Sequence, residues 1–156
     1  MSFRVQGLDP ADFSHLYGLS DQELGKLGVV RYVADAKPGF PDRVEMRDAE
    51  PGERLLLLNF EHLPSDSPYR SSHAIFVREG AETQYDEVDT VPPVMACRPL
   101  SVRAFDAKGM MQDARLIDGS EAARTFEDLL STETIEFLHV HNAIRGCYSG
   151  LVLRSG

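Results

Sequence analysis

The chain has 156 residues, of which 42% are hydrophobic and 26% charged, and this is the size and composition of one globular domain. Its formal net charge is −9 and only three lysines accompany thirteen arginines, which excludes a basic nucleic-acid-binding surface. No apolar run approaches the ~20 residues of a membrane-spanning helix and the N-terminus lacks a secretory signal pattern, so we expect a cytoplasmic protein without a membrane partner.

The N-terminal third predicts two strands and two short helices. Residues 3–8 have a β-like pattern, and Asp9 with Pro10 is typical of a helix start. A second helix follows from the capping box that Ser20 and Glu23 form. The run 29–35 then predicts a strand.

The rest of the chain is dominated by strands. Strands are predicted at 43–48, 54–62, 72–79, 134–142 and 147–154, with a hairpin over 99–118 and an exposed loop over 80–90. A helix near 119–131 has Asp118 as its N-cap and Glu121 completing the box. The sequence therefore predicts one α+β domain spanning 1–156, sheet-dominated and mostly antiparallel, with two short N-terminal helices.

The segment "HVHN" near the C-terminus carries two histidines at strand spacing. His139 and His141 should project from one face, with side-chain roots about 6.5–7 Å apart, which is close enough to share a metal ion. No third ligand lies nearby at a recognised spacing. Three interpretations stay open: a pair of ligands for a divalent metal, acid–base or ligand contact without a metal, and ordinary hydrogen-bonded structural histidines.

Two residues beside this pair are further candidates. Cys147 begins the returning strand, and in a simple hairpin it would lie beside the histidines, where a thiolate is activated. The alternative is that it is a small buried hydrophobic residue. Asn142 is a candidate ligand contact. The chain's two cysteines form no C-x-x-C pair, so we expect free thiols.

The segment "SPYRSSHAIFVRE" has an unusual concentration of donors. Tyr69, Arg70, Ser72 and His73 would form a corner suited to a carboxylate or phosphate. In the alternative interpretation Arg70 pairs with an acidic residue of the protein, and Tyr69 packs under the loop.

Two more polar residues occur at notable strand positions. His62 ends an apolar strand, where loops often line a cleft, although a surface position is equally compatible. Arg103 is a charge within a strand, and it is interpreted either as a cation of a binding site or as an edge-strand charge that discourages sheet association.

None of the widely shared catalytic or nucleotide-binding motifs occurs in the chain. The combination of "AKPGFPDRVEMRDAEPGERLLLLNFEH", "SPYRSSHAIFVRE", "LSVRAFDAKGMMQDARLIDG" and "HVHNAIRGCY" resembles the domain of unknown function 1203 family over nearly the full length. The resemblance implies a stand-alone cytoplasmic bacterial domain. It brings no reaction, cofactor or catalytic residue.

The functional expectation is a cleft where the strands bearing His62, His73 and His141 converge. A small anionic metabolite would be held there by Arg70 and Arg103, and His73, His139 or His141 would transfer protons. One alternative is a non-catalytic binding or interaction domain, dimerising through a sheet edge. Another is a metalloprotein in which His62 or His73 joins His139 and His141. The residues leave open whether the protein is an enzyme.

Overall fold

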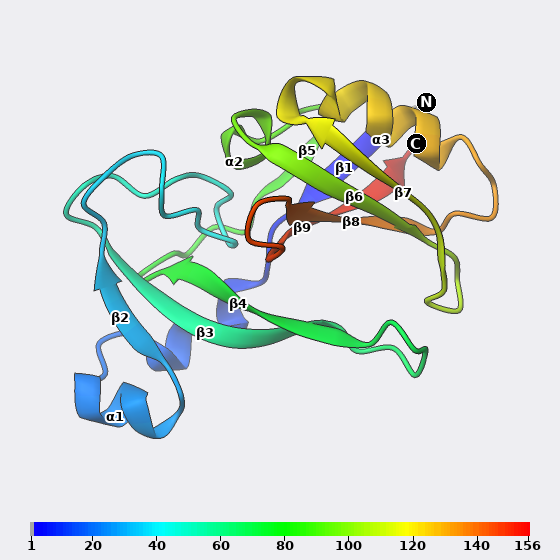
Figure 1. Ribbon diagram of the computed structural model, residues 1–156. Coiled ribbons are helices and arrows are strands. Elements are labelled where there is room, and N and C mark those ends of the chain that lie inside the picture. The colour runs from blue at the N-terminus through cyan, green and yellow to red at the C-terminus, as the bar shows by residue number, and fades with distance from the viewer. Residues whose placement is uncertain (1) are drawn as a thin grey trace.

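The structure consists of two antiparallel sheets that face each other, and strands of both sheets carry histidines (Figure 1). The computed structural model describes residues 2–156. The larger sheet has six strands in the order β5 (Asp86–Val88), β1 (Ser2–Gln6), β9 (Tyr148–Ser155), β8 (Phe137–Asn142), β6 (Pro99–Phe105) and β7 (Met111–Asp118). The smaller sheet has the order β2 (Val30–Val33), β3 (Arg54–Leu63) and β4 (Ser71–Arg78). The predicted α+β class with mostly antiparallel sheets is confirmed.

The helices are short, and those of the N-terminal segment contribute Phe13, Leu16 and Leu24 to the core on the inner face of the smaller sheet. The helical elements are the 3₁₀ turns Pro10–Asp12, Ser14–Leu16 and Gly119–Glu121, and the α-helices α1 (Asp21–Lys26), α2 (Pro93–Ala96) and α3 (Ala122–Leu130). The capping box before α1 is confirmed, since Ser20 accepts from the Glu23 amide and Glu23 accepts from the Ser20 amide. The first predicted helix is two 3₁₀ turns, because Pro10 starts a turn that Phe13 already ends.

The larger sheet is packed on its outer face by α3. Leu138 and Val140 of β8 enter an apolar core with Phe126 and Leu130 of the helix, and Phe3 meets Phe126 edge-on at 5.4 Å between ring centroids. Because side chains alternate along a strand, His139 and His141 must face the smaller sheet. Packing of the helix therefore determines which β8 residues point into the space between the sheets.

The smaller sheet contributes a second core on its inner face. Leu56, Leu58, Ile75 and Val77 pack there with Tyr148 of the larger sheet. Tyr148 is 3% exposed, so this tyrosine joins the two sheets by burying its ring among side chains of the other one. The inner face of the smaller sheet is thus apolar until the ends of β3 and β4.

Two local predictions were wrong. Residues 43–48 form no regular strand; the Asp42 carboxylate accepts from the amides of Glu45 and Arg78 instead, and only an isolated bridge joins Pro41 to Asp48. The predicted loop over 80–90 contains β5, which pairs with the edge of β1. In both places backbone partners far away in sequence decided the conformation, and the local side-chain pattern carries no signal of them.

No helix within the described range 2–156 is long and apolar enough to cross a bilayer.

We predict that Gly7→Ala destabilises the protein by about 1–3 kcal/mol, because the added methyl group would overlap the carbonyl oxygens of Val44 and Arg43, which are backbone atoms. Gly25 in α1 is the matched control, since its Cβ would have nothing within 4 Å. Gly25→Ala should stabilise the protein by roughly 0.5–1 kcal/mol. Urea unfolding of both variants measures the difference, and equal effects would contradict the close approach at Gly7.

Candidate functional site

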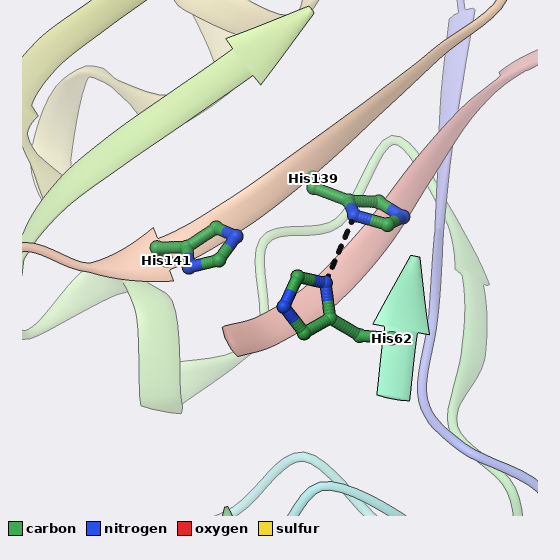
Figure 2. A group of neighbouring side chains, drawn as sticks. All are labelled: His62, His139 and His141. Atoms are coloured by element: carbon green, nitrogen blue, oxygen red, sulfur yellow. Dashed lines mark hydrogen bonds between the residues drawn. The ribbon is translucent and has the colours of Figure 1, made fainter. Parts of the chain in front are cut away.

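Four histidines from three strands converge between the sheets. His62 ends β3, His73 lies in β4, and His139 and His141 lie in β8. The His62 and His73 ring centroids are 4.8 Å apart, and His141 lies 5.0 Å from His62 and 5.1 Å from His73. Figure 2 shows the rings of His62, His139 and His141 pointing toward one another. These four residues are the histidine cluster.

The two strands of the smaller sheet bring His62 and His73 to one face. His62 follows Leu58 and Phe60 on the inner face of β3, as the sequence predicts. His73 is opposite Phe60 in the β3–β4 register, and the pairing shifts between Glu61 and Leu63. This irregularity lies at His62, at the point where the apolar inner face ends.

The ring contacts determine which nitrogens of the cluster are engaged. His62 Nε2 is 2.7 Å from His73 Nδ1 and 3.3 Å from Ser71 Oγ. His141 Nδ1 lies 2.9 Å from the Gly146 carbonyl oxygen, so this nitrogen donates and leaves Nε2 with its lone pair. The remaining His62 nitrogen, Nδ1, is 3.4 Å from His139 Nδ1.

Tyr148 is a site residue that the sequence analysis missed. Its ring stacks on His62 with centroids 4.7 Å apart and planes 5° from parallel. The β8–β9 pairing is irregular between Val140 and His141, so Tyr148 pairs with His141 and Leu151 with His139. In a regular hairpin, Cys147 would lie on the face of the sheet that carries His139 and His141. The signal in the sequence was an aromatic residue next to a turn, but the sequence does not show the bulge that turns Tyr148 toward the histidines.

The histidine cluster is held in its neutral form by its surroundings. Burial, together with repulsion from the neighbouring His73 and Arg103, lowers the pKa of His62 to about 4. Burial also lowers the pKa values of His139 and His141 to about 3, with added repulsion from neighbouring histidines and Arg103. His73 shifts in the same direction for the same first cause. At neutral pH all four rings are therefore uncharged.

Arg103 is the cation of the site. It lies in β6 directly opposite His139, and Ser101 lies opposite His141. Its Nε donates to Ser101 Oγ at 3.3 Å, and no carboxylate within residues 2–156 forms an ion pair with it. The edge-strand interpretation is wrong, because β6 is paired on both sides, by β7 and β8.

The predicted donor corner is split between two faces. Arg70 is exposed and donates to the Glu61 carboxylate at 3.2 and 3.4 Å. Ser72 is exposed opposite Glu61, whereas His73 faces inward. Tyr69 is partly exposed and its ring lies 6.0 Å from that of Phe105. Arg70 is thus satisfied by the protein's own acid, and the prediction that it shares a ligand with Arg103 is not supported by this placement.

Cys147 lies beside Arg43 rather than on the histidine face. Its sulfur accepts from Arg43 Nη2 at 3.2 Å and from Asn142 Nδ2 at 3.6 Å. Asn142 is buried, and its Oδ1 has no hydrogen-bond partner among the residues described. Arg43 was missed from the sequence because nothing local shows that it is fully buried. Both cysteines are free thiols, as expected.

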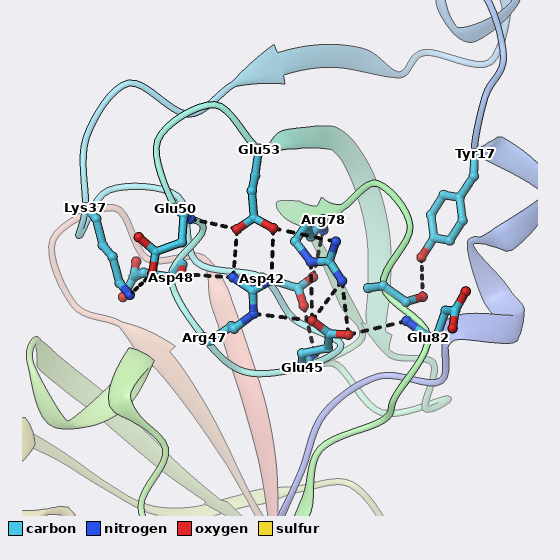
Figure 3. A network of polar contacts seen from close by, with 11 residues as sticks. Tyr17, Lys37, Asp42, Glu45, Arg47, Asp48, Glu50, Glu53, Arg78 and Glu82 are labelled. Atoms are coloured by element: carbon cyan, nitrogen blue, oxygen red, sulfur yellow. Dashed lines mark hydrogen bonds and ion pairs between the residues drawn. The ribbon is translucent and has the colours of Figure 1, made fainter.

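A second polar cluster holds the segment between β2 and β3 against β4 (Figure 3). Arg47 bonds both oxygens of Glu53, and Arg78 bonds both oxygens of Glu45. A cavity of about 380 Å³ adjoins this network and is lined by Arg78, Glu53 and Glu79 among others. Since the acids and arginines here form ion pairs with one another, we interpret this network as structural.

A smaller cavity of about 280 Å³ is connected to the histidine cluster through Phe137, whose ring centroid lies 5.0 Å from that of His139. It is lined by Leu63, Pro64, Ser65, Ala107, Lys108, Gly109 and Phe137. Leu63 follows His62 directly, and Phe137 precedes His139 by two residues on the same face of β8. The loops on either side of the cavity are tied together by the Ser67 hydroxyl, which donates to the Gly109 carbonyl at 2.7 Å.

These features define the chain as an antiparallel two-sheet α+β protein with a buried histidine cluster. The chain belongs to the family described as "Protein of unknown function (DUF1203)", which matches residues 39–154. The predicted resemblance is confirmed, and the matched segment contains all four clustered histidines and Arg103. Comparison with curated proteins and with solved structures returned no match.

We predict that metal-free protein loses stability as the pH falls from about 6.5 toward 4. The unfolded chain protonates its histidines near their ordinary pKa of about 6.5, whereas buried His62, His139 and His141 resist protonation. Each such group lowers the free energy of unfolding by up to about 1.4 kcal/mol per pH unit in this window.

Urea unfolding at about pH 7 and about pH 5.5 measures this slope. His139→Gln should flatten it, because glutamine does not titrate, whereas substitution of the exposed His15 should leave it unchanged. Equal stability at the two pH values would contradict the burial of neutral imidazoles.

Proposed function

We propose that this protein binds one divalent transition-metal ion through His62, His139 and His141. The observation that carries the proposal is that one ring nitrogen from each of the three residues lies within 4.8 Å of the others. His139 and His141 were the predicted ligand pair, and His62 supplies the third ligand that spacing in the sequence does not reveal.

The nitrogen separations support tetrahedral coordination. Two nitrogens, each about 2.0–2.1 Å from a zinc ion at the tetrahedral angle, lie about 3.3–3.4 Å apart. The Nδ1 atoms of His62 and His139 are separated by 3.4 Å. His141 would use Nε2, because its Nδ1 is engaged by the Gly146 carbonyl.

The outer contacts of the ligands also support the proposal. Histidines that ligate metals usually donate their second ring N–H to an acceptor, which sets the tautomer and the ring orientation. His141 has the Gly146 carbonyl for this purpose, and His62 Nε2 has His73 Nδ1 at 2.7 Å. His73 is thereby a positioning residue rather than a ligand.

The donor set indicates the kind of metal. Three neutral imidazoles suit zinc, copper, iron or nickel, whereas magnesium and calcium prefer oxygen ligands. An ion held by three protein ligands keeps a further position for a small molecule, as in catalytic zinc sites. Such an ion polarises the group bound to it, so the arrangement is suited to hydrolysis or another reaction at a polar bond.

Metal-free acid–base catalysis, the other use predicted for these histidines, is less well supported. A general acid or base works best with a pKa near the operating pH. The pKa values of His62, His139 and His141 lie about 3–4, which makes them weakly basic ligands rather than proton carriers at neutral pH.

Elemental analysis after equilibration with Zn²⁺ and gel filtration tests the proposal. We predict one zinc ion per wild-type chain, and none in a His139→Ala/His141→Ala double variant or in His62→Ala. His15→Ala is the matched control, since His15 is exposed in an N-terminal 3₁₀ turn, and this variant should retain one ion.

Two results would contradict the metal site. One is a wild-type protein that retains no zinc, and the other is a full zinc content in the double variant. Circular dichroism of each variant keeps loss of ligands separate from loss of fold. Bound metal should also raise the melting temperature of wild type, because an ion that binds only the folded state stabilises it.

A further inference from the structure

We propose that the metal site binds a small organic carboxylate, with the carboxylate held between the metal ion and the guanidinium of Arg103. This inference rests on the proposed function and deepens it by assigning a ligand class. Its first support is the unusual position of Arg103: a half-buried cation, opposite His139 in the sheet, with no acidic partner within the described residues 2–156.

The other buried or half-buried arginines show why this is informative. Arg31 pairs with Glu79, Arg78 with Glu45, and Arg98 with Asp48. Arg43 and Arg154 form no ion pair among the described residues, and each donates to two backbone carbonyl oxygens instead. Removing a guanidinium from water is costly unless an anion or several acceptors replace the water. Within the described range 2–156, Arg103 has the Ser101 hydroxyl as its one hydrogen-bond partner, which accepts from Nε, so both terminal nitrogens remain available to a ligand.

The charge of the loaded site favours an anion. All three proposed metal ligands are neutral, and no carboxylate or thiolate accompanies them in the ligand group. A divalent ion would therefore keep its full charge, next to that of Arg103. An anion bridging the two cations would satisfy both, and the planar guanidinium fork matches the two oxygens of a carboxylate.

The aromatic rings beside His139 indicate that the anion has an apolar body. Phe105 and Phe137 stack with ring centroids 5.2 Å apart, and each lies within 5.5 Å of the His139 ring. Leu63, Pro64, Ala107 and Phe137 give the adjoining 280 Å³ cavity apolar surface. An inorganic anion would leave this surface unused, whereas an organic acid can bury its hydrocarbon part there.

The cavity contributes one further charge of the same sign. Lys108 is among its lining residues and belongs to the β6–β7 turn. The one acid of that turn is otherwise engaged: the Asp106 carboxylate accepts from the amides of Lys108 and Met110 and from the Gln112 side chain. The approach to the site is therefore compatible with a negatively charged ligand.

Cobalt-substituted protein provides the test, because the visible spectrum of bound Co²⁺ responds to a change in its ligands. Benzoate is the probe, benzamide is the matched uncharged compound, and inorganic phosphate is the anion without an apolar body. We expect benzoate to change the spectrum saturably, with at least tenfold tighter binding than benzamide or phosphate.

Arg103→Gln should weaken benzoate binding by at least about tenfold, because a charge-assisted hydrogen bond is lost, while the cobalt content stays at one per chain. Arg70→Gln is the matched control and should bind benzoate like wild type, since Arg70 pairs with Glu61 on the exposed face.

The outcomes separate the two proposals. Bound cobalt with equal benzoate affinity in wild type and Arg103→Gln would overturn the role of Arg103 and leave the metal site standing. Phosphate binding as tightly as benzoate would overturn the organic-acid assignment. A protein that takes up no cobalt would overturn the metal site and this inference together.

Discussion

Three buried imidazoles and the half-buried His73, all uncharged, lie between the two sheets, and the geometry of the site rests on their packing. His139 and His141 are 4% and 1% exposed, yet no acid lies in the group that they form with His62. A buried carboxylate would raise the histidine pKa values and favour imidazolium. Its absence from the group, together with burial and Arg103, keeps the lone pairs free, which is the state that binds a metal ion.

The same contacts connect the sheets mechanically. Tyr148 enters the core of the smaller sheet and stacks on His62, while β8 is anchored from its other face by α3. The ring positions thus depend on packing from both sides. A site built from β-strands and supported by a buried aromatic ring can hold its geometry within the narrow tolerance that metal binding needs.

The arginines of the protein differ in whether the fold supplies them with a carboxylate partner. Arg47, Arg78 and Arg98 are matched with carboxylates and stabilise the loop between β2 and β3. Arg103 has no such match among the residues of known position and faces the histidine cluster. Identical side chains therefore have different surroundings, which are determined by the acids that the fold places within reach.

Local patterns in the sequence predict most of the fold and part of the site. A nearly continuous apolar run identified β3, the Ser20–Glu23 box located α1, and alternation placed His139 and His141 on one face. Those features are local, since they follow from backbone geometry within a few residues. The tertiary structure alone decided that His62 completes the group, that Tyr148 displaces Cys147, and that Arg70 and Arg103 lie on different faces. These placements depend on strand register, bulges and sheet packing. Contacts between residues distant in sequence determine all three, so no local sequence pattern predicts them.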